Sequence, residues 1–164
     1  LDPTAGMIAA LALFAAGFLF RPVGALVFGR LGDRFGRKGA FLATVVLMGG
    51  ATFAIGLLPN YAQAGALGTS LLIFLRILQG LAVGGEYGGA AIYVAEHAPA
   101  DRRGRATSWI QSSASFGLVG ALTAVLATRS IVGEEAFVAW GWRIPFLISA
   151  GLLGVSIWMR LKLK

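Results

Sequence analysis

Five long apolar stretches divide this 164-residue sequence, and they restrict its fold more than any other feature. A helix that crosses a lipid bilayer needs about 20 mostly apolar residues. The stretches that meet this requirement cover residues 7–29, 39–58, 70–95, 106–128 and 144–159, and we expect Arg21-Pro22 to break the first of them. We therefore predict an all-α fold, a polytopic membrane helix bundle with five transmembrane helices.

The composition argues against a soluble domain. Hydrophobic residues make up 57% of the sequence and charged residues only 13%, against about 25% charged residues in a typical soluble domain. A soluble fold of about 150 residues hides only about 70% of the surface that its unfolded chain exposes. It could not bury this much apolar area, so we expect the lipid bilayer to solvate much of the surface.

The net charge of +7 comes from cations gathered in the connections between the apolar stretches. Residues 29–38, residues 102–105 and the last residues are rich in Lys and Arg, whereas residues 59–69 have no charge. The connection before the last stretch carries only Arg129 and Arg143 beside two glutamates. Connections rich in Lys and Arg stay in the cytoplasm. The pattern predicts a multi-pass protein of the cell (inner or plasma) membrane, with the chain start outside and the chain end cytoplasmic, and no nucleic-acid partner.

Metal and enzyme chemistry find little support in the sequence. It has no Cys and a single histidine, His97, so we expect neither a thiolate nor a histidine metal centre. An intramembrane enzyme would need a Ser/His pair or paired acids at membrane depth, and only one acid lies within a predicted span. The first residues lack an initiator Met and the basic start of a signal peptide, so we expect a chain that begins within a longer protein.

Two charges, Arg21 and Glu86, lie at similar predicted depths. They precede Gly29 and Glu96 by eight and ten residues, which at about 1.5 Å per residue places them roughly 12 and 15 Å from the boundary. A charge at the bilayer centre costs about 2.5–3.5 kcal/mol and normally faces a partner or a wet cavity. We expect the two to pair or to share a cavity; the alternative is that Arg21 snorkels to the lipid headgroups.

A polar strip follows the third stretch. Gln79 and Glu86 are seven residues apart and share a helix face, with Arg76 at its edge. Such a strip should face the bundle interior. Arg76 and Gln79 are candidates for contact with an anionic solute or for tuning a protonatable group. Glu86, with Tyr87 beside it, is the candidate for proton coupling, and a permanent structural ion pair is the alternative.

Glycines recur in the same stretch, at positions 80, 84 and 88 and again at 85 and 89. Small residues at four-residue spacing let membrane helices pack closely. A glycine-rich phosphate loop would need a soluble strand–turn–helix context. We therefore predict a close helix contact here.

The connection of residues 29–38 carries the most specific motif. We expect a ten-residue loop whose glycines permit a tight backbone. Asp33 can accept hydrogen bonds from a helix N-terminus or pair with an arginine. On charge alone, a simple cytoplasmic loop is the favoured interpretation.

The pattern Gly29-x-x-x-Asp33-Arg34-x-Gly36-Arg37-Lys38 resembles the signature loop between helices two and three of the major facilitator superfamily. Residues 76–80, Arg-Ile-Leu-Gln-Gly, resemble a motif of that family's fourth helix. Glu96, followed by Arg103-Gly104, is similar to the pair at the cytoplasmic end of the same helix, and residues 141–146 resemble the opening of the sixth.

The resemblance implies that the five stretches match helices 2–6. Residues 1–164 would then be a partial N-terminal six-helix half, without helix 1 or the C-terminal half of the transporter. In that fold the Arg76–Gln79 pair has a further possible role, a polar link to helix 1.

Three segments, residues 21–24, 84–89 and 142–146, look most like the metabolite:proton symporter branch, which includes carriers of proline and betaine, α-ketoglutarate, citrate and shikimate. The resemblance implies symport of a small organic acid or betaine by alternating access, driven by the proton gradient without a cofactor. Antiporters of the family often carry a Gly-Pro pair midway along the helix that matches residues 106–128. Residues 116–120 contain two glycines but no proline, which weakens an antiporter interpretation. The alternatives are a sugar-porter-like carrier and a membrane scaffold or channel.

The resemblance also implies a cytoplasmic gating cluster that latches one state of the transporter. Its candidate members are Gly29, Asp33, Arg34, Gly36, Arg37, Lys38, Glu96 and Arg103. The alternative is a solvated surface network of small energetic value.

Overall fold

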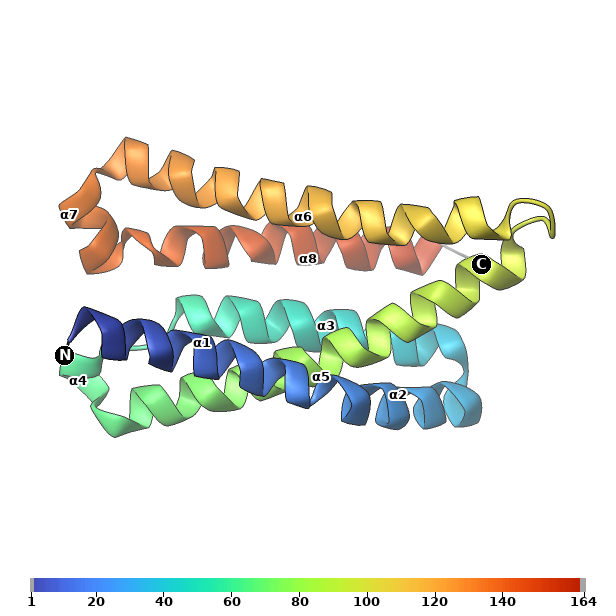
Figure 1. The fold of residues 1–164 in the computed structure, drawn as a ribbon, viewed down its shortest axis with the longest axis horizontal. Helices are drawn as coiled ribbons and strands as arrows, with labels where there is room; N and C mark the ends of the chain where they lie inside the picture. The colour runs from blue at the N-terminus through green and yellow to red at the C-terminus, as the bar shows by residue number, and fades with distance from the viewer. Residues whose placement is uncertain (1, 163–164) are drawn as a thin grey trace.

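The computed structural model describes residues 2–162, and that part of the chain is built from helices with no β-strand. The predicted all-α class is confirmed. In chain order the helices are α1 (Pro3–Leu19), α2 (Arg21–Phe35), α3 (Arg37–Gly56), α4 (Tyr61–Ala64), α5 (Ala66–His97), α6 (Arg103–Val132), α7 (Glu134–Ala136), the π-helix η1 (Phe137–Gly141) and α8 (Arg143–Lys162) (Figure 1).

Four helices of the described chain are long and apolar enough to cross a membrane. They are Thr4–Phe35, which joins α1 and α2, and the helices α3, α5 and α6. The segments Glu134–Gly141 and Arg143–Met159 meet at a bend of 58° and supply a fifth span when taken together. These spans agree with the predicted polytopic bundle.

The first span is interrupted where the sequence predicts it. α1 ends at Leu19 and α2 begins at Arg21, with Pro22 in its first turn. Proline has no N–H to donate and is tolerated at the start of a helix, where that donor has no partner anyway. The new helix is established when the Gly24 N–H donates to the Phe20 carbonyl over 3.0 Å.

The predicted ten-residue loop at 29–38 is wrong. α2 continues to Phe35 and α3 begins at Arg37, so that only Gly36 separates them. Gly36 has φ 92°, which glycine adopts without steric cost, and its N–H donates to the Gly32 carbonyl over 3.0 Å. The error arises because polar residues end a membrane span without ending the helix. For the same reason α5 and α6 extend beyond the predicted stretches at both ends.

The long helices run side by side, so the connections alternate between two ends of the molecule (Figure 1). The α2–α3 turn, the α5–α6 connection and the end of α8 lie at one end. The beginning of α1, the short α4 and α7 lie at the other. The cation-rich connections therefore share one end of the bundle, as the sequence pattern predicts.

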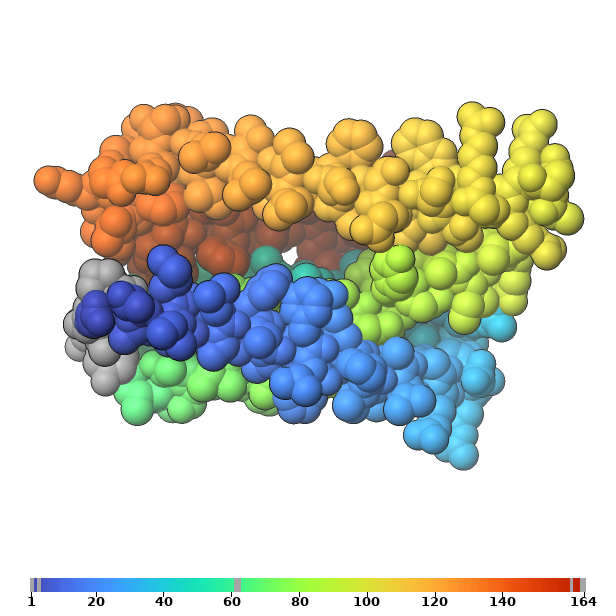
Figure 2. All heavy atoms as spheres, viewed as in Figure 1, coloured from blue at the N-terminus to red at the C-terminus, as the bar shows by residue number. Residues whose placement is uncertain are grey.

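Helix α5 is the centre of the packing. It has its most extensive contacts with α2 and α3, and α3 in turn packs along α8. The buried apolar residues of the described chain all lie on α3 and α5: Ala40, Val45, Ala51, Ile55 and Ala82. α6 has a smaller interface with α5, and Figure 2 shows an opening between α6 and the helices α1 and α5 near the middle of the molecule.

The predicted close contact of the glycine rows is confirmed. A Cβ atom at Gly80 would lie 2.1 Å from the Gly17 carbonyl oxygen, and one at Gly84 would lie 1.9 Å from that of Arg21. Gly85 faces Phe28 in the same seam, whereas Gly88 has open space around it. The missing side chains thus let α5 touch the backbone of α1 and α2.

Candidate functional site

A cavity of about 120 Å³ lies within the bundle, between the first span, α3 and α5. It brings together three of the predicted candidates, Arg21, Arg76 and Gln79. The rest of the lining is Phe14, Gly17, Phe18, Met48, Gly80 and Val83. The position of Arg21 depends on the helix break, because Arg21 opens α2 just after the interruption.

A chain of hydrogen bonds fixes the polar side of this cavity. The Arg76 Nη1 donates to Gln79 Oε1 over 3.1 Å, and Gln79 Nε2 donates to Thr52 Oγ1 over 2.9 Å. The Thr52 hydroxyl donates to the Met48 carbonyl over 2.8 Å. Gln79 is only 7% exposed, so the predicted inward orientation of the polar strip holds at this residue. The guanidinium of Arg76 has five N–H donors, and its hydrogen bond to Gln79 uses one of them.

Arg21 has a less complete set of partners. Its Nε is buried and has no hydrogen-bond partner. Its guanidinium carbon lies 3.6 Å from the centre of the Phe18 ring, a cation–π contact worth about 2 kcal/mol when desolvated. A buried donor without a partner costs about 1–3 kcal/mol. Arg21 therefore stands in this cavity with a donor that an acceptor would stabilise.

Glu86 lies outside the lining of the cavity, although the sequence predicts a depth similar to that of Arg21. The Arg21 carbonyl contacts Gly84, two residues before Glu86 on α5. The predicted Arg21–Glu86 pairing stays a prediction. Tyr87 also lies outside the lining of the cavity. Its side chain is exposed, and its hydroxyl lies 3.5 Å from Gln111 Oε1 on α6.

An ion pair joins the helix ends at the cation-rich end of the bundle. Arg37, the first residue of α3, pairs with Glu96 near the end of α5. The side chains are 58% and 50% exposed. The hydrogen bond and charge of Glu96 raise the pKa of the Arg37 guanidinium, and the nearby Asp33 carboxylate raises it further. Two predicted cluster members from different helices thus meet, with Asp33 beside them.

The positions of the other predicted members of the gating cluster follow from the helices that carry them. Arg103 begins α6 and makes no ion pair with a described residue, while its neighbour Arg102 pairs with Asp101 over 3.4 Å. Arg34 and Lys38 lie on either side of the Gly36 turn, and Gly29 lies in α2 with open space around it. The described residues contain no group of three or more acids and histidines able to hold a metal ion.

One structural residue had no predicted role beyond its motif. Arg143, at the start of α8, donates through Nη2 to the Leu58 carbonyl over 2.9 Å and to Asn60 Oδ1 over 3.1 Å. Its guanidinium also stacks on Trp142 at 4.7 Å. It ties α8 to the end of α3. Its position as one of only two arginines in a cation-poor connection was the sequence signal that could have revealed it.

Comparisons with known proteins agree with this architecture. The family model for "Sugar (and other) transporter" matches residues 4–163. The chain is 46% identical over 159 residues to the proline/betaine transporter of Salmonella typhimurium, covering 97% of this chain and 32% of that protein. It is 43% identical to the shikimate transporter of Escherichia coli, covering 97% and 36%. The chain thus spans about a third of the length of these relatives.

The inward-open structure of the xylose transporter XylE from E. coli superposes with a TM-score of 0.78 and 22% identity. The match covers 92% of this chain and 36% of that one, and it supports the fold. The predicted resemblance is therefore confirmed, and the family and fold are those of transporters rather than enzymes. With its several apolar helices, this membrane protein belongs to the sugar (and other) transporter family of the major facilitator superfamily.

Proposed function

We propose that the full-length protein is a proton-coupled symporter of a small organic acid or betaine in the cell membrane. Residues 1–164 are its partial N-terminal half, corresponding to helices 2–6, and a C-terminal half completes the transport pathway. Transport proceeds by alternating access of the two halves around a site near the bilayer midplane. The observation that carries the proposal is the cavity that Arg21, Arg76 and Gln79 line together.

The chemistry of this cavity favours a carboxylate. Its lining includes two guanidinium groups and no acid, and arginine binds carboxylates through two parallel hydrogen bonds. A volume of about 120 Å³ is below the roughly 300–1,000 Å³ of a typical ligand pocket, so it takes the carboxyl end of a solute. Proline, betaine and shikimate, the solutes named for two relatives, all carry this group.

Proton coupling is assigned to Glu86, the one acid within the membrane-spanning part of α5. Coupling requires a group that gains and loses a proton as the site changes its exposure. A carboxylate within an apolar helix is suited to this, because it can exist in a charged and in a neutral form. The cation-rich end faces the cytoplasm, and the Arg37–Glu96 pair acts there as part of the latch.

Uptake by the full-length protein in membrane vesicles tests the proposal, with and without an inward proton gradient. The solutes are citrate, α-ketoglutarate, shikimate, proline, betaine and xylose. We expect the gradient to stimulate saturable uptake of a carboxylate or betaine. Glu86→Gln should abolish the stimulation, whereas the control Asp101→Asn, an exposed acid in the α5–α6 connection outside the spans, should retain it.

The alternatives give different results in the same assay. Uptake of xylose alone would support a sugar carrier, and the similarity to the xylose transporter bears on the fold only. Uptake that neither saturates nor responds to the gradient would indicate a channel, and no uptake a scaffold. Gradient-driven uptake that survives Glu86→Gln would refute the role of Glu86 while leaving the symport in place.

A further inference from the structure

The cation-rich end of α2 carries two arginines without an ionic partner. Arg30 and Arg34 are exposed, lie one helical turn apart, and make no ion pair with any residue that the structure describes. Arg37, one turn further along the chain, differs because Glu96 neutralises it. The end of α2 therefore presents two uncompensated positive charges to its surroundings.

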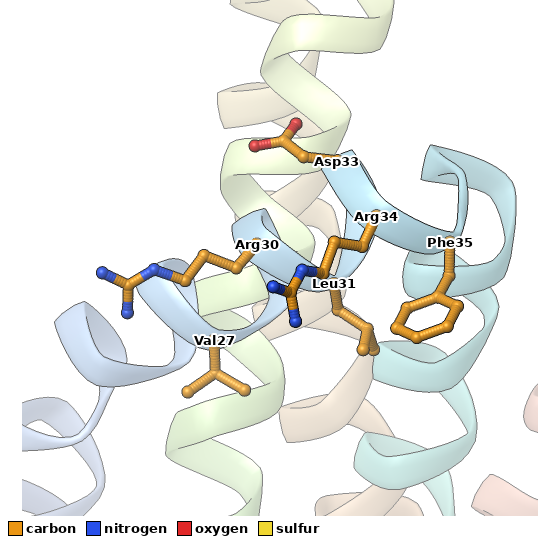
Figure 3. A pocket seen from close by; sticks show the side chains of 6 residues that line it. All are labelled: Val27, Arg30, Leu31, Asp33, Arg34 and Phe35. Carbon is orange, nitrogen blue, oxygen red and sulfur yellow. The ribbon is translucent and has the colours of Figure 1, made fainter.

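An apolar surface lies directly beside these charges. Val27, Leu31 and Phe35 continue along the same part of α2, and Phe35 is 76% exposed. Together with Arg30, Asp33 and Arg34 they line an open groove of about 520 Å³ (Figure 3). We call this surface the α2 groove.

The one acid of the α2 groove is directed away from its apolar side. Figure 3 shows the Asp33 carboxylate projecting to the opposite side of the helix from Leu31 and Phe35. Its charge acts on Arg37, on the first turn of α3. Asp33 therefore leaves the groove with an excess of positive charge.

This combination of charge and apolar area selects a particular ligand. Guanidinium groups bind phosphate oxygens in a bidentate manner, and Val27 and Leu31, which precede Arg34 on the membrane side, can pack against hydrocarbon. A free phosphate ion would use only the arginines. A phospholipid uses both, because its phosphate and its acyl chains are covalently joined.

We propose that the α2 groove binds an anionic phospholipid of the cytoplasmic leaflet, with the headgroup on Arg30 and Arg34 and the start of an acyl chain along Leu31 and Val27. The proposal rests on the membrane orientation given under the proposed function. Anionic lipids attract basic residues at the membrane surface by about 1 kcal/mol each. Two arginines then correspond to roughly a thirtyfold preference.

Native mass spectrometry of the purified full-length transporter tests the α2 groove. The protein is titrated with phosphatidylglycerol and with phosphatidylcholine of the same acyl chains. We expect tighter binding of phosphatidylglycerol to the wild type and a loss of roughly thirtyfold in Arg30→Gln/Arg34→Gln. The matched control Arg102→Gln/Arg105→Gln removes two exposed charges from the same end and should change binding less than about twofold.

Two further arms distinguish a lipid from a free phosphate. Val27→Gln keeps both charges and should weaken phosphatidylglycerol binding severalfold, because it removes exposed apolar area on the membrane side of the arginines. Excess inorganic phosphate should not displace the lipid. Displacement by phosphate, equal binding of the two lipids by the wild type, or equal losses in the two double variants would each overturn the proposal.

The result of the lipid-binding experiment does not depend on the transport mechanism. Lipid binding is measured without a solute or a gradient, so failure of the symport proposal leaves the result readable. Gradient-driven uptake with no preference for phosphatidylglycerol would overturn the α2 groove alone.

Discussion

Helix α5 packs closely against its neighbours on one side and loosely on the other. Toward α1 and α2 it presents glycines that touch backbone carbonyls, and toward α3 it shares the buried polar chain through Gln79. Toward α6 it makes fewer contacts, among them the long Tyr87–Gln111 hydrogen bond, and residues 111–123 of α6 are all exposed. The comparison teaches that the chain holds one tightly specified seam, between α5 and the first span, and one loose interface.

The largest expected effect comes from a single methyl group in the tight seam. In Gly84→Ala the new Cβ would lie 1.9 Å from the Arg21 carbonyl oxygen, so the helices must separate. We expect a loss of about 3 kcal/mol or more in unfolding free energy, measured by thermal unfolding of the purified full-length protein.

The control for the seam is the same change on α6. A Cβ atom at Gly117 would have no neighbouring atom within 4 Å, and alanine favours a helix over glycine by up to about 1 kcal/mol. Gly117→Ala should therefore leave stability unchanged or raise it. Equal destabilisation by both variants would contradict the contrast between the two interfaces.

A second test addresses the polar chain. Gln79→Leu removes the acceptor of Arg76 and the donor to Thr52, leaving polar groups unpaired at a cost of about 1–3 kcal/mol. We expect a lower unfolding temperature together with weaker solute binding. The matched change Gln111→Leu, in the loose interface, should alter neither by much; a similar loss there would show that Tyr87–Gln111 is a stronger link than its geometry implies.

A third test concerns the link between α3 and α8. Arg143→Met deletes two hydrogen bonds to the end of α3 and should cost about 1–3 kcal/mol, as hydrogen bonds from a charged donor do. Arg129→Met breaks the exposed Arg129–Glu134 pair at the end of α6, where we expect at most about 1 kcal/mol. Chemical denaturation of both variants gives the order directly, and the reverse order would refute it.

The smallest expected effect is at the exposed Arg37–Glu96 pair. Arg37→Gln should barely change the unfolding temperature, because solvent screens the pair. The pKa of Arg37 is raised in the folded protein, so its contribution is complete below the unfolded pKa and is lost only as the pH rises through the folded one. Between neutral and mildly alkaline pH, the unfolding temperatures of the wild type and of Arg37→Gln should therefore respond to pH in the same way.

The sequence predicted the features that depend on local composition. Span positions follow from apolar length, and the alternation of the connections follows from clustered charge. The helix break at Arg21-Pro22 follows from the chemistry of proline. These signals lie within one segment, so they can be read without knowing what the segment touches.

The parts that escaped prediction depend on partners distant in sequence. Thr52 could not be assigned to Gln79, nor Arg143 to Leu58, because each pair is brought together only by helix packing. The turn at Gly36 was missed for another reason: a helix continues through charged residues once it has left the lipid, so charge marks the membrane boundary rather than the helix end.

The regular spacing of the glycines along α5 has a consequence for how the helices choose their alignment. Gly17 meets Gly80 and Arg21 meets Gly84, so the two helices run in the same direction. A shift of four residues, about 6 Å along the axis, would place Gly84 and Gly88 at the same positions, and Gly89 opposite Phe28. Small residues alone thus permit two alignments of nearly equal shape. The Gln79–Thr52 hydrogen bond breaks this degeneracy, because α3 is joined to α2 through the single residue Gly36 and the bond to α3 can form in only one of the alignments.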